Sequence, residues 1–145
     1  MTSRIVVPAL LALSCVACVS APLAPQLVAV RADGTHFLRG ADCLDPGMAR
    51  SWADLGDGSL LVDAGRRKYH IRLGAGCQDV HWTPMLLMRG EPISGRVCGG
   101  LGDAVISRDY TCRIQDMQMI DAEQYKSLIQ RRDDERARRK ANPAG

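Results

Sequence analysis

Hydrophobic and polar side chains alternate most regularly in residues 51–73, which read SWADL, GDG, SLLVDA, GRR and KYHIRL. In the last of these segments the apolar Tyr69, Ile71 and Leu73 are separated by single polar residues, which is the period of a strand with one buried face. The glycines between the segments readily take the positive φ angles of tight turns. The pattern predicts a three-stranded antiparallel meander.

Two more hairpins are predicted downstream, the first from PMLLMRG, EPISG and RVC and the second from GDAVIS, RD and YTCRIQDMQMI. In the last strand the inward positions Cys112 and Ile114 are followed by Met117 and Met119, and such a change of parity is typical of a β-bulge. About six short strands with glycine-rich turns, and no helical pattern between them, predict an all-β fold, either a small antiparallel barrel or a rolled sheet.

After the last strand the pattern becomes helical. Asp121 and Gln124 have the spacing of a capping box. Four apolar positions then fall on one helical stripe, at Ala122, Tyr125, Leu128 and Ile129. Beyond Gln130 charged side chains dominate. We therefore expect a charged C-terminal α-helix that docks by its first two turns and then projects into solvent.

The first residues have the layout of a secretory signal. A leader with the single charge of Arg4 precedes a nine-residue apolar run, residues 5–13, and small residues with two cysteines follow. The run is too short to cross a bilayer, which takes about 20 apolar residues. The C-x-x-C of Cys15 and Cys18 therefore lies in a segment that is removed or modified on export, and it does not indicate a redox site.

Each of these two cysteines follows a small residue, as in a bacterial lipobox, where a cysteine receives acyl chains such as palmitate. Cys18 is the favoured lipidation site and Cys15 the alternative, because cleavage before Cys18 leaves four later cysteines that can pair completely. Ordinary cleavage after Ala21 is a third option, which Pro22 disfavours. In bacterial lipoproteins, an aspartate directly after the lipidated cysteine marks retention in the inner membrane. Val19 stands at this position, so the chain resembles lipoproteins of the outer membrane, which face the periplasm. A soluble periplasmic protein is the alternative.

The chain therefore divides into four parts. A signal peptide spans residues 1–17 and a lipid-anchored tether residues 18–34. A disulfide-bonded β domain follows in residues 35–120, and a charged helical tail in residues 121–145. After the signal, one folded domain of ordinary size remains.

The charges of the mature chain lie unevenly. Eleven basic and eleven acidic side chains cancel in residues 18–120, whereas residues 121–145 carry seven basic and five acidic ones. A nucleic-acid partner would require a basic face on the folded body, so no nucleic acid is expected. The membrane is the expected partner through the lipid anchor, and the tail could contact an envelope protein or an anionic surface.

Four cysteines follow the signal, at Cys43, Cys77, Cys98 and Cys112. In an exported protein this even number predicts disulfides, for which three pairings exist. The shorter loops favour Cys43–Cys77 with Cys98–Cys112. A metal site is the alternative, but no mature pair has C-x-x-C spacing and no H-x-x-x-H accompanies the cysteines. We therefore expect two disulfides and no cofactor.

The histidines give little indication of chemistry. His36 lies in a loop or a first strand, and His70 on the exposed side of an amphipathic strand. His81 has Met85 and Met88 nearby, a soft ligand set of the kind that binds copper. Because methionines on a strand more often fill a core, these three residues are weak metal candidates and no metal site is expected.

No catalytic residue is predicted. Ser94 lacks the G-x-S-x-G elbow of serine hydrolases, and the segment GGLGD lacks the helix and lysine of a phosphate-binding loop. Aspartates are close in sequence at two turns, Asp42 with Asp45 and Asp54 with Asp57, but turns commonly carry solvated aspartates. The sequence therefore favours a protein that is not an enzyme.

A pattern of cysteines, apolar strand positions and one turn extends over most of the body: Cys43, Trp52, Leu60 with Val62, Tyr69, Cys77, Cys98, Gly102-Asp103 and Cys112. Between Phe37 and Asp121 this pattern resembles a family of small four-cysteine proteins of the Gram-negative envelope whose function is unknown. The resemblance implies an exported, often lipid-anchored protein with paired cysteines, and it implies no activity.

Together these features predict an exported envelope lipoprotein that acts as a binding or structural module without catalysis. A small periplasmic hydrolase is the alternative, and a soft-metal carrier the less favoured one. The hydrolase would require His36 or His81 to share a cleft with Asp42, Asp45 or Asp103.

Overall fold

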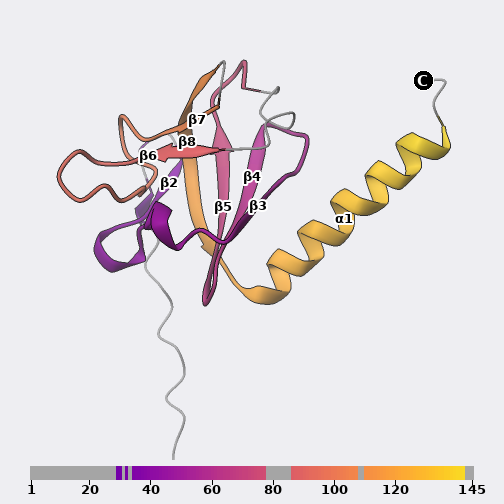
Figure 1. Ribbon diagram of the computed structural model, residues 1–145, viewed down its shortest axis with the longest axis horizontal. Helices are drawn as coiled ribbons and strands as arrows, with labels where there is room; N and C mark the ends of the chain where they lie inside the picture. The colour runs from indigo at the N-terminus through magenta and orange to yellow at the C-terminus, as the bar shows by residue number, and fades with distance from the viewer. Residues whose placement is uncertain (1–28, 31, 33, 78–85, 108–109, 143–145) are drawn as a thin grey trace, which may run out of the picture.

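The computed structural model describes residues 29–30, 32, 34–77, 86–107 and 110–142. Its main element is a six-stranded antiparallel sheet that curls into a half-barrel, with the strand order β3-β4-β5-β8-β7-β6 (Figure 1). These strands are β3 (Ser51–Asp54), β4 (Ser59–Ala64), β5 (Arg67–Leu73), β6 (Leu87–Arg89), β7 (Ala104–Ile106) and β8 (Thr111–Ile120). The predicted rolled sheet is confirmed.

Four smaller elements and one helix complete the described fold. The short strands β1 (Ala29–Val30) and β2 (His36–Phe37) pair with each other. Two 3₁₀ turns follow, η1 (Gly40–Asp42) and η2 (Pro46–Met48), and the α-helix α1 (Ala122–Ala141) comes after β8. Among the described residues, no helix combines the length and the apolar character needed to span a bilayer.

The meander predicted from alternation is confirmed as β3, β4 and β5. Leu60 pairs with Ile71 and Val62 with Tyr69, so that apolar side chains of adjacent strands meet on the inner face. The tight turn between β4 and β5 contains Gly65, whose φ is +75°. Positive φ is costly for residues with a Cβ, which explains a glycine at this position.

The prediction of the first downstream hairpin is wrong. β6 pairs with β7 rather than with the residues around Val97. The Val97 backbone exchanges two hydrogen bonds with Leu44, and the N–H groups of the next three residues donate to the Asp103 carboxylate. Because these backbone groups are already paired, they are not available for hydrogen bonds with β6.

The last hairpin, β7 with β8, is confirmed together with its bulge. Arg72 lies opposite Asp116 and Leu73 opposite Ile114, so Gln115 is the extra residue of β8. The insertion changes the parity of the strand. As a result both Ile114 and Met117 are buried in the core.

The core lies on the inner face of the half-barrel, beneath the segments that contain η1 and Val97. Its fully buried side chains include Leu44, Leu60, Val62, Tyr69, Ile71, Val97, Val105, Ile114 and Met117. Side chains on strands alternate between faces. Lys68, His70 and Arg72 therefore point to the outer face of β5.

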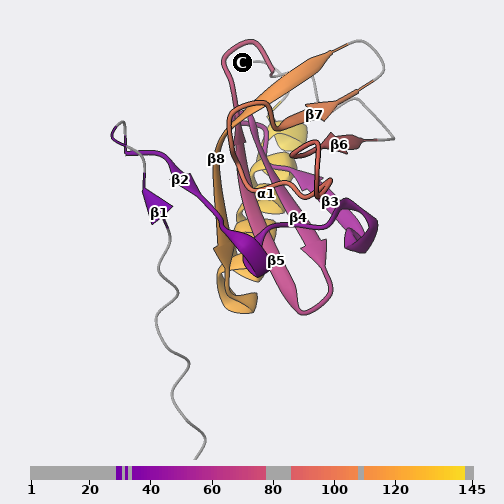
Figure 2. The same ribbon diagram turned by 90° about the vertical axis from the view of Figure 1, so that its left-hand side faces the viewer.

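Helix α1 lies on this outer face, behind β3, β4 and β5 in Figure 2. The predicted capping box is present, because the Asp121 carboxylate accepts from the Gln124 N–H and the Gln124 side chain accepts from the Asp121 N–H. The Lys68 ammonium lies 5.4 Å from the centre of the Tyr125 ring. Leu61, an outer-face residue of β4, has no exposed surface.

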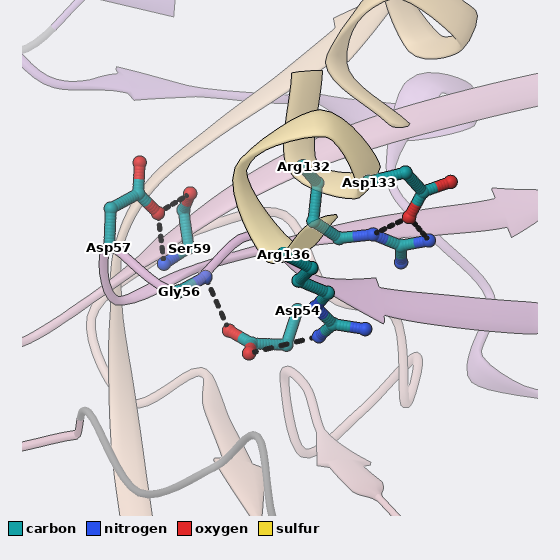
Figure 3. A network of polar contacts seen from close by, with 7 residues as sticks. All are labelled: Asp54, Gly56, Asp57, Ser59, Arg132, Asp133 and Arg136. Carbon is teal, nitrogen blue, oxygen red and sulfur yellow. Dashed lines mark hydrogen bonds and ion pairs between the residues drawn. The ribbon is translucent and has the colours of Figure 1, made fainter. Parts of the chain in front are cut away.

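The contact of α1 extends beyond the two turns that the sequence predicted. Arg136 reaches the carboxylate of Asp54 at 3.8 Å, and the same carboxylate accepts from the Gly56 N–H (Figure 3). Arg132 instead forms an ion pair with Asp133 of the same helix. The apolar stripe ends at Ile129, but long arginine side chains continue the contact, which a pattern of apolar residues does not indicate.

Two disulfides are present, as predicted, but the favoured pairing is wrong. The bonds join Cys43 to Cys98 and Cys77 to Cys112. The Leu44–Val97 bridge places Cys43 opposite Cys98, with 4.5 Å between their Cα atoms. Loop-closure entropy grows only with the logarithm of loop length, so the pairing of strands decides the connectivity.

Candidate functional site

The β4–β5 hairpin ends in a tight turn at the bottom of Figure 1. Residues of this turn line a cleft. Its volume is about 570 Å³. Four arginines line it, at Arg50, Arg66, Arg67 and Arg96. They come from three separate segments of the chain, and we call the hollow the arginine cleft. A volume of this size suits a small ligand.

The floor of the arginine cleft is uncharged. Cys43, Leu44 and Tyr69 contribute to it, and each is almost fully buried. Burial raises the pKa of the Tyr69 hydroxyl, so the phenol stays neutral at physiological pH. The hydroxyl donates to the Asp42 carbonyl oxygen at 3.2 Å, which fixes the ring.

Two of the arginines are oriented by backbone carbonyl oxygens. Arg67 donates to the Ala41 carbonyl, and Arg96 donates to the Gly40 carbonyl at 3.3 Å. A carbonyl oxygen orients a guanidinium without cancelling its charge. Arg67 also lies 3.9 Å from the Asp42 carboxylate, and both of these side chains are more than two-fifths exposed. An exposed pair at that distance is weak.

Arg50 lies across the β4–β5 turn. A Cβ atom on Gly65 would come within 3.2 Å of its guanidinium carbon, so the glycine leaves room for it. The nearby Asp63 carboxylate is occupied by Lys68, whose ammonium lies 2.6 Å from it. The hydrogen bond from Lys68 lowers the pKa of Asp63. The charge of Arg50 also lowers the pKa of Asp63, but Lys68 is the cation that contacts this carboxylate directly.

A second hollow of about 520 Å³ adjoins the arginine cleft and shares Cys43 and Arg96 with it. Its polar side chains include Glu91 and Ser94. The Glu91 carboxylate accepts from the Ser94 hydroxyl at 2.7 Å and from two backbone N–H groups. These hydrogen bonds lower the pKa of Glu91, and the bond from the Ser94 side chain has the largest effect. The carboxyl group is therefore ionised at neutral pH.

A polar cluster of different character ties β2 to β8. The Asp116 carboxylate is 4% exposed and accepts from the His36 backbone N–H at 2.6 Å and from His36 Nδ1 at 2.8 Å. Gln118 donates to the same carboxylate at 3.1 Å. Burial alone would raise the pKa of Asp116, but the hydrogen bonds from His36 and Gln118 lower it. The Gln118 amide nitrogen also lies 2.7 Å from His36 Nδ1, so the three side chains form one hydrogen-bonded cluster.

The carboxylates that a hydrolase would need with His36 are bound to other groups. Asp42 faces Arg67, Asp45 caps η2 through the Gly47 N–H, and Asp103 accepts three backbone N–H groups. His36 instead pairs with Asp116, which the sequence did not single out. His81, the other histidine of that hypothesis, lies outside the described residues.

The remaining candidates of the sequence fall in structural positions or outside the described residues. Asp54 contacts Arg136, Asp57 accepts from Ser59, and Ser94 donates to Glu91. Met88 is half-buried against the core. Within the described part of the chain, no three histidine, cysteine or carboxylate side chains are grouped to hold a metal. Outside it lie Cys15, Cys18, His81 and Met85.

His70 is half-buried rather than exposed, which corrects the sequence prediction. Its neighbours across the sheet are Leu61 and Gln118, and α1 covers this face of the sheet. Its Nε2 atom is buried and has no hydrogen-bond partner among the residues that the structure describes. Burial lowers the pKa of His70.

We expect His70 to make the fold less stable as the pH falls. The unfolded chain takes up this proton near pH 6.5 and the folded chain only at lower pH, so stability is lost below about 6.5. Urea unfolding at pH 7.5 and 5.5 measures the loss. His70→Gln, which cannot titrate, should show a smaller difference between the two pH values. An equal difference in both proteins would contradict the prediction.

The arginine cleft itself was missed at the sequence level. Arg66 and Arg67 are adjacent in the GRR turn, but Arg50 and Arg96 are distant in sequence. Only the meander and the Leu44–Val97 bridge bring them together. The one local signal was a pair of arginines at a hairpin tip, where charged residues are common.

Comparison with known proteins gives one match. The model of a family of unknown function (DUF6491) matches residues 1–136. This span is longer than the resemblance between Phe37 and Asp121, and it takes in the leader and most of α1, so the helix belongs to the family pattern. No curated protein and no solved structure is detectably similar to the chain.

Proposed function

We propose that this chain, which belongs to the family of unknown function, is an exported binding protein. In this proposal it holds a small anionic ligand in the arginine cleft and catalyses no reaction. The observation that carries the proposal is the convergence of Arg50, Arg66, Arg67 and Arg96 around an uncharged floor. Guanidinium groups bind carboxylates and phosphates through paired, charge-assisted hydrogen bonds.

The electrostatics of the cleft support an anion. Four arginines and a single carboxylate of the described chain, that of Asp45, line the cleft, and the Asp42 carboxylate lies 3.9 Å from Arg67, so positive charge is in excess. The carbonyl contacts of Arg67 and Arg96 hold these side chains in place before a ligand arrives. Such pre-organisation reduces the entropy lost on binding.

The compartment agrees with a ligand of the cell envelope. Two disulfides indicate an oxidising, exported environment. We further propose that Cys18, or alternatively Cys15, carries the lipid that anchors the protein in the outer membrane, facing the periplasm. The residue pattern of the leader supports this anchor, which would hold the arginine cleft near the membrane surface.

We expect inorganic pyrophosphate and glutarate to bind in the cleft. Removing two guanidinium groups with Arg66→Gln/Arg67→Gln should weaken binding about tenfold or more. Isothermal titration at low salt measures the affinities, and thermal unfolding checks the fold of the variant. Arg138→Gln/Arg139→Gln on α1 removes the same charge far from the cleft and serves as the control. Equal weakening in both variants, or no binding, would refute the proposal.

A further inference from the structure

We consider the two adjoining hollows together and call them the groove. The arginine cleft and the smaller hollow share Cys43 and Arg96, and the Cys43–Cys98 disulfide lies where they meet. The smaller hollow is bordered by the loop from Glu91 to Arg96, which is closed by a hydrogen bond from the Glu91 N–H to the Arg96 carbonyl at 2.9 Å. The groove thus runs from the β4–β5 turn, past the disulfide, to this loop.

The two ends of the groove have opposite charge. Arg50, Arg66 and Arg67 line one end, whereas Glu91 lies at the other. The Glu91 Oε2 atom already accepts two hydrogen bonds, but Oε1 accepts a single one, at 3.2 Å from the Ile93 nitrogen. Because each carboxylate oxygen can accept about two hydrogen bonds, Oε1 retains the capacity to accept from a ligand ammonium group.

Between its ends the groove is lined by apolar groups and by Arg96, which borders both hollows. The disulfide sulfur atoms lie there beside Leu44 and Tyr69 of the arginine cleft. An uncharged spacer of several atoms would therefore fit between the anionic and the cationic group of a ligand. A ligand that carried both charges on adjacent atoms would leave one end of the groove unused.

We infer that the groove binds a short zwitterionic peptide, with its carboxylates at the arginine end and its ammonium group at Glu91. This inference rests on the proposed function and adds the identity of the ligand. A phosphoethanolamine headgroup carries the same two charges, but it lacks a peptide backbone between them, whose carbonyl oxygens could accept from Arg96 in the middle of the groove.

The test uses the tetrapeptide lysyl-alanyl-alanyl-aspartate and the same peptide with both amino groups acetylated. We expect the free peptide to bind about three- to fivefold more tightly, which is the size of an effect for an exposed ion pair. Glu91→Gln should abolish this difference, because the amide cannot form an ion pair with an ammonium group. Glu123→Gln on α1 removes an equal charge outside the groove and should preserve the difference.

The outcomes separate this inference from the proposed function. If both peptides bind equally and Arg66→Gln/Arg67→Gln weakens both, the placement of the ammonium group at Glu91 is refuted. The anion site of the proposed function is then still supported. If neither peptide, pyrophosphate nor glutarate binds, both proposals are refuted. If glycerophosphoethanolamine binds more tightly than the free peptide and depends on Glu91, the assignment to a peptide is overturned.

Discussion

Asp103→Ala is expected to lower the free energy of unfolding by about 3–5 kcal/mol. One oxygen of this carboxylate accepts from the N–H groups of Cys98, Gly99 and Gly100, at 2.8, 2.9 and 2.9 Å. Asp103 is 3% exposed, so water cannot easily replace it. Alanine would remove the acceptor of all three hydrogen bonds, and a buried donor that loses its partner costs about 1–3 kcal/mol.

Urea unfolding with the disulfides intact measures this loss. Asp103→Asn keeps a carbonyl oxygen at the same position and should cost less than half as much as the alanine substitution. Asp45→Ala is the matched control, because Asp45 is exposed and its carboxylate accepts from one backbone N–H, that of Gly47. Its expected cost is about 1 kcal/mol. A similar cost for Asp103→Ala would show that the three bonds are not stabilising.

The second large effect is expected from the disulfides. Cys77→Ala/Cys112→Ala should cost about 4 kcal/mol, because the bond closes a loop with a sequence separation of 35. Cys43→Ala/Cys98→Ala removes the bond with a separation of 55 and should cost a similar amount. Domains of this size are stable by about 5–15 kcal/mol, so each variant should still fold, with a clearly lower midpoint in urea.

The connectivity can be tested with the same set of variants. Cys43→Ala/Cys98→Ala leaves Cys77 and Cys112, which should form a disulfide and present no free thiol to an alkylating reagent. Cys43→Ala/Cys77→Ala removes one cysteine of each pair, and it should leave two reactive thiols and lose more stability. The reverse result would support the consecutive pairing that loop length alone favours.

Local patterns were sufficient to predict much of the fold. The alternation around Tyr69 and Ile71 marked β5, the change of parity before Met117 marked the bulge, and the spacing of Asp121 and Gln124 marked the start of α1. Each of these signals depends on residues within one element. Their periods report directly on the local geometry of strand or helix.

Features that depend on contacts between distant segments could not be predicted in this way. The pairing of β6 with β7, the disulfide partners and the partial burial of His70 within the sheet all follow from topology. The arginine cleft is of the same kind. Alternation shows that Arg66 and Arg67 are exposed at a turn, but it does not show that Arg96 faces them across the Leu44–Val97 bridge.

The order of the two disulfides along the chain has a consequence for maturation. The bonds interleave, because Cys77 lies between Cys43 and Cys98, whereas Cys98 lies between Cys77 and Cys112. During translocation the cysteines emerge in sequence order, so an oxidase that joins them as they appear would link Cys43 to Cys77. A native molecule therefore arises only if oxidation waits until the sheet has formed, or if thiol–disulfide exchange later reshuffles the first bond.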